Sequence, residues 1–406
     1  MDQFTLSKSQ ARKIILHAAG LSKRAQFGKG MEAVYKLIDH LGFVQIDTIY
    51  VVERAHHHTI ASRVPDYKPE WLERLQEDRR IFEFWTYAAG FIPIQDFRYS
   101  LPVKESFLSR RKPLTPTEAN LMKKILDRVS REGPVMARDF ENDRVTKSTG
   151  WWDWRPSKVA LERLHFDGRL MTFRRRDFQK VYDLTENLLP TDIETTSPTN
   201  EEFARHTILR SLKALGIGYF KDISYRSRYV KISLKQELEK LIKEGKVVQV
   251  VVEGVNGAPL YMSAEYTKKK INLPGDVFIL SPFDVLNVHR HRLKDFFEFD
   301  YQVECFVPKP KRKYGYFSLP ILIGETFVAR MDSKADRKQQ ILTINNLHFE
   351  PIELTKPMVA KVCKAIQDFA KFNQCEAIVI QKSNDKSVLK AIREMISEMP
   401  LKVSLR

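Results

Sequence analysis

The stretch VVQVVVEGVNGAPLYM, residues 247–262, decides the fold class of this chain. It consists of two runs rich in residues that favour β-strands, with Asn256-Gly257 between them as the turn of a β-hairpin. Three helical patterns precede the hairpin, over 201–215, 219–224 and 232–244. Helix, short helix, helix and hairpin in this order are typical of a winged-helix domain, which we place at 196–270.

The same plan occurs earlier in the chain. Helical patterns over 116–131 and 156–166 are followed by a hairpin pattern over 170–184, with Arg174 to Asp177 at its tip. We therefore expect a second winged helix at 113–195. The helical patterns at 7–21, 30–41 and about 51–63 indicate a first, looser copy at 1–112, in which no clear wing follows the third helix.

The character of the sequence changes after residue 270. Five stretches are typical of strands: FILSPFDV, YQVECFVP, YGYFSLPILI, ETFVARMD and QQILTINNL. A helical pattern over 357–372, the strand pattern EAIVIQK and a final helix follow them. We expect a mixed α/β lobe at 271–406, and an α+β protein as a whole.

The charge of the chain points to a polyanionic partner. The sequence has 68 Lys and Arg against 51 Asp and Glu, a formal net charge of +17. Nucleic acid is the leading candidate, with an anionic membrane or ribosomal RNA as alternatives. Winged helices dock on DNA with a helix in the major groove. They also serve as spacers between proteins, but the charge favours nucleic acid.

The sequence also indicates a compartment. It contains no run of about 20 apolar residues that could span a bilayer. The first residues, MDQFTLSKSQARKIIL, lack the layout of a signal peptide. The three cysteines, Cys305, Cys363 and Cys375, form no CxxC pair, which fits a reducing cytoplasm and argues against a cysteine zinc site.

The stretch GFVQIDTIYVVERAHHH, residues 42–58, combines a strand pattern with polar residues. Side chains alternate along a strand, so Val44 and Ile46 point one way while Gln45 and Asp47 point the other way together. An amide beside a carboxylate is a candidate catalytic pair. The alternative is structural: Asp47 caps the following helix and Gln45 bonds to nearby backbone.

Two further clusters are expected to be structural. His56, His57 and His58 are consecutive on a predicted helix, so they fan around it and cannot all bind one metal ion. We expect core packing or local hydrogen bonding for most of them, with His56 buried. Trp151, Trp152 and Trp154 could stack on bases, but such a cluster is more often part of a core.

Basic and aromatic residues gather between 309 and 338. A phosphate-binding face is one interpretation, and a solvated basic loop is the other. Two prolines and two tyrosines stiffen the first part, which favours binding. The candidate DNA-binding residues are Lys309, Lys311, Arg312, Lys313, Tyr314, Tyr316, Arg330, Lys334, Arg337 and Lys338.

Several long motifs together resemble one known family. They are VQIDTIYVVERAHH, IFEFWTYAAGFIP, GWWDWRPSKVALERL, LSPFDVL, FDYQVECFVPKPKRKYGYFSLPIL and VARMDSKADRK. In content and order they resemble the YcaQ/AlkZ family of bacterial DNA glycosylases, which are built from tandem winged helices, over nearly the whole chain. Gln45 and Asp47 resemble the Gln-x-Asp motif of the YcaQ branch, which unhooks interstrand crosslinks, whereas the AlkZ branch carries Gln-x-Gln.

The resemblance implies a function in DNA repair by base excision. It implies a monofunctional glycosylase that acts on N7- or N3-alkylated purines, including crosslinks, with Gln45 and Asp47 as the catalytic residues. The winged helices would form a concave basic channel around alkylated or crosslinked double-stranded DNA. We expect a monomer in the bacterial cytoplasm, associated with the nucleoid and not with a membrane, and no metal or other cofactor.

The chain departs from the family pattern in two places. Val288, His289 and Arg290 stand where Trp-Asp-Arg is usual, and Ala61 stands where Trp is common. Both bear on fine substrate preference. The alternative to an enzyme is a winged-helix regulator that binds DNA without catalysis.

Overall fold

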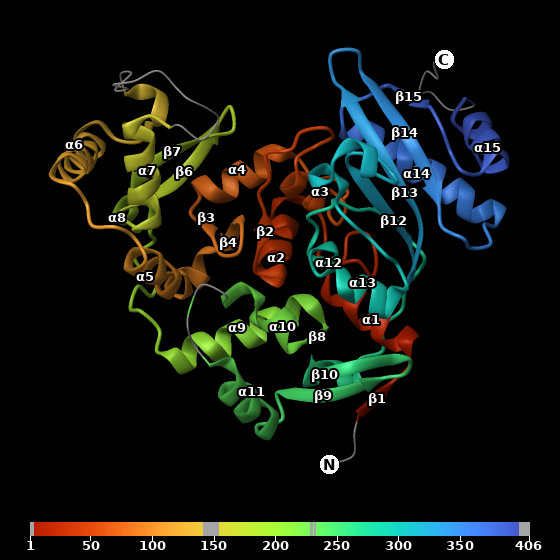
Figure 1. Cartoon of the computed structure of the whole chain (residues 1–406), viewed down its shortest axis with the longest axis horizontal. Helices are drawn as coiled ribbons and strands as arrows, with labels where there is room; N and C mark the ends of the chain where they lie inside the picture. Colours follow the sequence, from red (N-terminus) through yellow and green to blue (C-terminus); the bar gives the residue numbers. More distant parts are fainter. Residues whose placement is uncertain (1–3, 141–153, 228–229, 231–232, 398–406) are drawn as a thin grey trace. The chain divides into compact units, whose positions relative to one another are not determined.

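The computed structural model describes residues 4–140, 154–227, 230 and 233–397. The chain divides into two compact units. The first comprises Met1–Tyr67, Leu209–Ile223 and Leu238–Arg406, and the second comprises Lys68–Ile208 and Ser224–Glu237. Both contain helices and strands (Figure 1), which confirms the predicted α+β class. The division into four domains at 1–112, 113–195, 196–270 and 271–406 stays a prediction. No helix in the described ranges is long and apolar enough to cross a membrane.

The first unit begins with a short strand and helices whose ends follow local rules. They are β1 Phe4–Leu6, α1 Lys8–Ala18, α2 Gly30–Leu41 and α3 Ala55–Ala61. Ser7 and Gln10 form a reciprocal capping box at the start of α1. Gly42 ends α2 with φ of 63°, a left-handed conformation that glycine adopts without strain. The predicted positions of α1 and α2 are confirmed, whereas α3 begins four residues later than predicted.

A four-stranded sheet contains the hairpin that decided the fold class. Its strands are β8 Ile217–Tyr219, β9 Val247–Val252, β10 Val255–Ser263 and β1, in the order β1-β9-β10-β8. Strand β1 pairs in parallel with β9, an extension of the wing that we did not predict. The helices that precede the hairpin are α9 Asn200–Leu215, α10 Phe220–Ile223 and α11 Leu234–Lys243, as expected from the helical patterns.

The hairpin turns at a different place from the one predicted. Val252 pairs with Val255, so the chain turns at Glu253-Gly254, and Asn256-Gly257 lies in an irregular part of β10. The buried side chains Val250, Val252, Leu260 and Met262 explain the register. A slip in pairing would bring these residues to the solvent side, and this cost outweighs the local preference of Asn-Gly for a turn.

The C-terminal part of the first unit is built on a curled, five-stranded half-barrel sheet. Its strands, in spatial order, are β11 Val277–Ile279, β12 Ser318–Ile323, β13 Thr326–Asp336, β14 Ile341–Phe349 and β15 Ala377–Ile380. Only the β14–β15 pair is parallel. Apolar residues of α14 Lys356–Phe372 and α15 Lys386–Ser397 share one core with these strands.

One predicted strand of this region is absent. The segment YQVECFVP, residues 301–308, forms no strand; it contains the single turn η5 Glu304–Phe306, and the turn η6 Lys309–Lys311 follows. Two short helices, α12 Val285–Val288 and α13 Arg290–Phe297, precede it. The segment reads as a strand because its apolar residues alternate, but Val303 and Glu304 are both buried while Phe306 is exposed.

The second unit starts with a helix and a hairpin. They are α4 Pro69–Glu77, β3 Ile81–Trp85 and β4 Ala89–Pro93, followed by η1 Ile94–Ser100 and α5 Leu101–Ser109. The motif IFEFWTYAAGFIP thus forms the β3–β4 hairpin, in which Ile81 pairs with Pro93.

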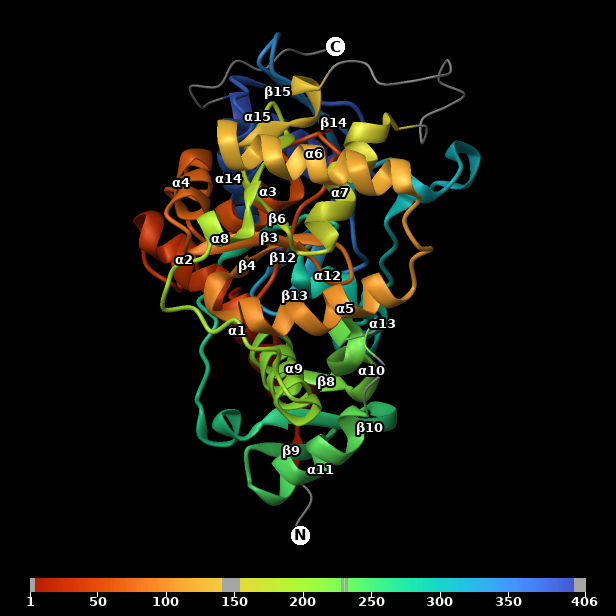
Figure 2. The same ribbon diagram turned by 90° about the vertical axis from the view of Figure 1, so that its left-hand side faces the viewer.

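The rest of the second unit follows the predicted order of elements. These are α6 Pro116–Glu132, β5 Val135–Met136, α7 Pro156–Phe166, β6 Leu170–Arg176, β7 Gln179–Leu184 and α8 Thr185–Leu188. Helix α6 lies across α7 (Figure 2), and both contribute to one apolar cluster with the β6–β7 hairpin. This hairpin turns at Asp177-Phe178, both of which have positive φ.

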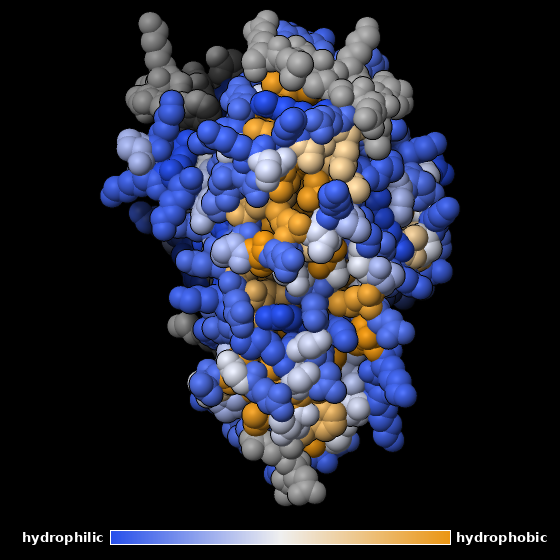
Figure 3. Space-filling model, turned by 90° about the vertical axis from the view of Figure 1, so that its right-hand side faces the viewer, coloured by the Kyte–Doolittle hydropathy of each residue, from blue (hydrophilic) through white to orange (hydrophobic). Residues whose placement is uncertain are grey.

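Hydrophilic residues predominate on the face drawn in Figure 3, and they surround a central band of apolar residues. Such a surface fits a strongly charged chain whose apolar residues are mostly buried. Among the described large apolar side chains, eight are exposed, and the exposed fraction of Phe306, 73%, is the largest.

Candidate active site

Gln45 and Asp47 lie where strand β2, Val44–Gln45, passes into a loop. Val44 and Ile46 are buried, while Gln45 and Asp47 are both partly exposed. The predicted alternation between a buried face and an accessible face is therefore confirmed, although only two residues have strand geometry.

Asp47 does not cap the next helix. Helix α3 begins at Ala55, and its N-cap residue, Arg54, makes no side-chain cap bond. Asp47 instead accepts a hydrogen bond from the backbone N–H of Ile49, with 2.8 Å between Oδ1 and N. Partial burial raises the pKa of Asp47 above its ordinary value, and hydrogen bonds from the N–H groups of Ile49 and Thr48 offset only part of this. Asp47 is thus a fixed, partly desolvated carboxylate.

The amide of Gln45 is not used to satisfy nearby backbone. Its side chain forms no hydrogen bond with any residue in the part of the chain that the structure describes. The structure therefore shows neither the helix cap nor the Gln45 backbone bond of the structural alternative, while Asp47 does bind the backbone of the turn that follows it. The pair retains polar groups that can meet a ligand.

The loop after Asp47 is fixed to the C-terminal sheet. The N–H of Ala335, in β13, donates to the carbonyl of Val51 at 2.8 Å. Val52 is completely buried in the core of this sheet, and the N–H of Glu53 donates to the buried Asn373 at 2.7 Å. These anchors give the carboxylate of Asp47 a defined position although its loop has no regular structure.

Tyr50 of this loop lies between two arginines. Its ring centre is 4.3 Å from the guanidinium carbon of Arg54 and 4.0 Å from that of Arg337. Arg337 also pairs with Glu53 at 3.4 Å between Nη2 and Oε2. Two cations thus lie on the exposed ring of Tyr50, which follows Asp47 by three residues in the sequence.

The three histidines have internal roles. His56 and His58 are buried, as expected. Nδ1 of His57 lies 2.6 Å from the hydroxyl of Tyr67, and Nε2 of His58 lies 2.9 Å from the carbonyl oxygen of Ile279. Burial lowers the pKa of both His57 and His58 to about 4, so both are neutral at pH 7. Within the described ranges, no three acidic, histidine or cysteine side chains are grouped so that they could hold a metal ion.

A buried ion pair that we did not predict joins Arg63, just after α3, to Asp284 of the LSPFDVL motif. Arg63 donates two hydrogen bonds to Asp284, of 2.7 and 2.9 Å, and both side chains are completely buried. Arg63 also donates to the carbonyl groups of Ala19 and Thr59. Asp284 belongs to the LSPFDVL motif, but Arg63 lies outside all of the long motifs, and no pattern in the sequence pairs the two residues.

The predicted basic residues separate into two groups. Lys309, Lys311, Lys313, Lys334 and Lys338 are exposed, as is Tyr316; Arg312, Tyr314 and Arg337 are partly exposed. Arg330 is instead an interior residue. It is 3% exposed, pairs with Glu350 at 2.6 Å between Nε and Oε1, and lies over the rings of Phe299 and Tyr314. We therefore leave Arg330 out of the DNA contacts proposed below.

Trp154, expected in the core, is 38% exposed, and the ammonium of Lys158 lies 4.3 Å from its ring. Trp151 and Trp152 lie outside the described residues.

The departures from the family pattern have structural consequences. Asp222 lies between His289 and His291, with its Oδ1 3.2 Å from Nδ1 of His289 and 2.9 Å from Nε2 of His291. Burial alone would raise the pKa of Asp222, but these two histidines and Arg292 hold it well below its usual range. Val288 ends α12, and Arg290 begins α13.

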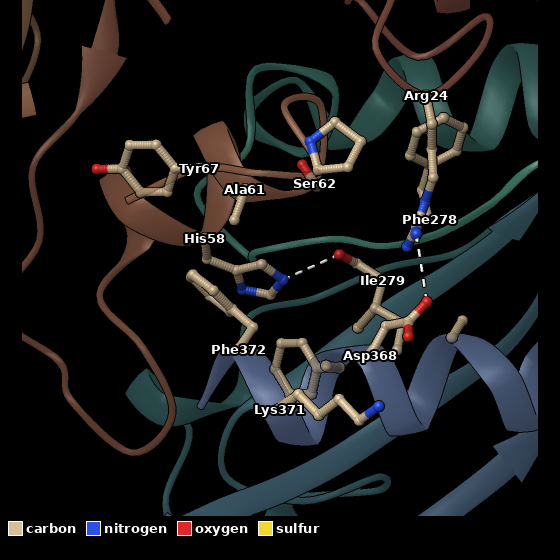
Figure 4. Close-up of a pocket in the computed structure, with 13 residues that line it drawn as sticks. Arg24, His58, Ala61, Ser62, Tyr67, Phe278, Ile279, Asp368, Lys371 and Phe372 are labelled. Atoms are coloured by element: carbon tan, nitrogen blue, oxygen red, sulfur yellow. Dashed lines mark hydrogen bonds and ion pairs between the residues drawn. The ribbon is translucent and has the colours of Figure 1, made fainter. Parts of the chain in front are cut away.

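A cavity of about 400 Å³ lies elsewhere in the first unit. It is lined by His58, Ala61 and residues of α14, and the ion pair between Arg24 and Asp368 lies at its edge (Figure 4). Ala61 opens onto this space, where the resembled family often has a tryptophan. Neither Gln45 nor Asp47 lines this cavity.

Comparison with known proteins identifies the family and the fold of this chain. The family model for AlkZ-like DNA glycosylases matches residues 38–372, and the chain belongs to this family. The fold is that of the DNA glycosylase AlkZ of Streptomyces sahachiroi: the two structures superpose with a TM-score of 0.60 over 93% of this chain and 100% of that chain, at 16% sequence identity. At this identity the likeness concerns the fold, and the substrate has to be argued from the residues of this chain.

Proposed function

We propose that this chain hydrolyses the N-glycosidic bond of N7- and N3-alkylated purines in double-stranded DNA, including purines in interstrand crosslinks. One observation carries the proposal: Asp47 is a partly desolvated carboxylate, held by the N–H of Ile49 and accompanied by the unengaged amide of Gln45. Family membership supplies the class of enzyme.

The chemistry follows from the charge of the alkylated base. An N7- or N3-alkylpurine is cationic, so when its bond to C1′ breaks, the electron pair goes to the ring nitrogen and a neutral base departs without protonation by the enzyme. The sugar acquires oxocarbenium character, which the negative charge of Asp47 stabilises. A water molecule then adds to C1′ and transfers a proton to Asp47. Gln45 can orient the water or the sugar.

The same reasoning limits the reaction to base removal. A lyase activity of the Schiff-base type needs a lysine amine at the reacting sugar. No lysine occurs between Gly42 and His58. We therefore propose a monofunctional enzyme that leaves an abasic site in an intact strand.

The DNA-binding part of the proposal uses the exposed cations. Lys309, Lys311 and Lys313 belong to the first unit. So do Lys334, on β13, and Lys338, in the turn between β13 and β14. Contacts from these ammonium groups to phosphates would bind any duplex sequence. Three tandem winged helices around a concave basic channel belong to the same proposal, because an open channel admits a base that is tied to the opposite strand.

The test is a panel of defined duplexes scored for abasic sites and for free base. We expect release from duplexes with 7-methylguanine, 3-methyladenine or a nitrogen-mustard crosslink, with and without a chelator. Uracil, hypoxanthine and 8-oxoguanine are neutral leaving groups that need an acid or a fitted pocket, so these duplexes should stay intact. Duplex binding without release of any base would instead indicate the non-catalytic regulator.

A further inference from the structure

Phe306 is presented to solvent by a loop that is otherwise closely held. Its side chain is 73% exposed, the largest fraction among the large apolar side chains that the structure describes. It lies at the end of the turn η5, between the partly buried Cys305 and Val307. A ring in this position gains little from burial in the folded core and is open to a binding partner.

The loop around Phe306 is rigid because a buried carboxylate closes it. Glu304 is 4% exposed and accepts three backbone hydrogen bonds of 2.8 Å, from the N–H groups of Lys313, Tyr314 and Gly315. On the other side, Nε of Arg312 donates to the carbonyl of Val307 at 2.8 Å. The backbone on both sides of the Phe306 turn is therefore fixed.

The same loop carries unpaired positive charge. Lys309, Lys311 and Lys313 are exposed, and none of their ammonium groups forms an ion pair with a residue in the described parts of the chain. An exposed aromatic ring among lysines is the combination with which proteins stack on nucleic-acid bases while holding the backbone. A protein partner would have to present acidic and apolar groups that match this loop, and nothing in the described residues indicates such a partner.

The loop also lies close to Asp47. Cys305 packs on the same apolar cluster as Ile49 and Val51 of the loop that carries Asp47. Burial raises the pKa of the Cys305 thiol, and the negative charge of Asp47 raises it further. Phe306 is the next residue in the chain. A ring that enters the duplex here would enter beside the sugar on which Asp47 is proposed to act.

We propose that Phe306 is a wedge that inserts its ring between base pairs next to the lesion and stacks on the exposed base. Insertion of an apolar side chain unstacks one base step and kinks the duplex. Such a wedge would expose the glycosidic bond of a base that cannot rotate out of the helix because it is crosslinked to the other strand. The inference rests on the proposed function and names the residue by which that site would open its substrate.

The experiment uses the full chain and a duplex with a 2′-fluoro-stabilised 7-methylguanine, which resists hydrolysis, beside a 2-aminopurine that fluoresces when unstacked. Wild-type protein should increase the fluorescence, and Phe306→Ala should not. Loss of one stacked base should weaken binding by roughly 5- to 150-fold. Phe306→Trp should retain both the signal and the affinity, and Phe306→Leu should retain neither fully.

Leu108→Ala is the matched control, because Leu108 is a 43% exposed apolar residue on α5. It should leave both signals unchanged. Equal fluorescence and affinity for Phe306→Ala and wild type would overturn the wedge. A Phe306→Ala variant whose main change is the loss of self-association would overturn it too.

Release of free 7-methylguanine from the unfluorinated duplex separates this inference from the proposed function. If wild-type protein releases base but fluorescence does not depend on Phe306, the wedge is wrong and the glycosylase stands. If no base is released but fluorescence still depends on Phe306, the wedge stands and the glycosylase is wrong.

Discussion

The guanidinium of Arg337 lies on the ring of Tyr50, 4.0 Å from the ring centre, and so connects the end of strand β13 to the loop that carries Asp47. The contact joins residues that are 287 positions apart in the sequence. It gives Arg337 two candidate roles, a phosphate contact and a support for the catalytic loop.

Substitution of Arg337 separates these roles. Arg337→Lys keeps the charge but cannot stack as a plane on Tyr50. If Arg337 positions the loop, Arg337→Ala should lower both the duplex affinity and the single-turnover rate of base release. Arg337→Lys should then keep the duplex affinity of wild type but not its rate. Lys338→Ala is the control for loss of charge alone, since Lys338 is exposed and next in sequence; it should lower duplex affinity but not the single-turnover rate. Full recovery of the rate by lysine would show that Arg337 acts through its charge alone.

The buried pair Arg63–Asp284 should dominate the stability of the first unit. Asp284→Asn leaves the buried guanidinium of Arg63 without a counter-charge, which should cost about 3–5 kcal/mol in the free energy of unfolding. Chemical denaturation measures this. The exposed pair Arg128–Glu132 on α6, with 2.8 Å between Nε and Oε2, is the control, and Glu132→Gln should change stability little. Similar effects of the two substitutions would contradict the assignment.

The lysines of the Phe306 loop should set the salt dependence of DNA binding. Each lost phosphate contact lowers the slope of log K against log salt by about 0.9, so Lys309, Lys311 and Lys313 changed together to Ala should lower it by about 3. Arg312 is kept because its guanidinium holds the loop. Lys390→Ala, at a side chain 81% exposed on α15, is the control. A wild-type slope for the triple variant would place this loop away from the DNA.

The raised pKa of Asp47 predicts how the rate of base release falls at low pH. Only the ionised carboxylate accepts a proton from water, so the rate should fall as pH decreases through this pKa. Because burial raises the pKa, this fall should lie at a higher pH than for an exposed aspartate. Single-turnover rates of base release against pH measure it. A rate that is flat down to the ordinary range of aspartate would contradict this environment.

The same shift has a consequence for stability, with opposite sign. A carboxyl group whose pKa is higher in the folded than in the unfolded state binds its proton more tightly when folded. Its ionisation therefore weakens folding as pH rises through the folded pKa. At neutral pH, Asp47→Asn removes this cost, so the variant should be at least as stable as wild type in thermal unfolding. A lower Tm would mean that the carboxylate has a structural role.

Much of the fold could be predicted from local sequence. The Ser7 cap, the Gly42 helix end and the burial of Val44 and Ile46 each depend on neighbours within a few residues. Three features could not be predicted in this way. The β1–β9 pairing, the Arg63–Asp284 pair and the burial of Arg330 depend on residues brought together from distant parts of the chain.

The candidate site shows the same division. The motif indicated Gln45 and Asp47 because their spacing places both on one side of the chain. Nothing in it indicated that Ala335 and Asn373 would fix their loop, or that residues 301–308 would turn at Phe306 and not extend. In the latter segment, three hydrogen bonds to the buried Glu304 stabilise a turn where local alternation favours a strand.

The most direct test of the central claim is the single-turnover release of 7-methylguanine from a defined duplex by wild-type protein, Asp47→Asn and Gln45→Ala. The account predicts that Asp47→Asn folds and binds the duplex like wild type but releases base about a hundredfold more slowly or worse, as expected for loss of a positioned general base. Gln45→Ala should cost less, because Gln45 orients and accepts no proton. Base release by Asp47→Asn at a rate close to that of wild type would contradict the account.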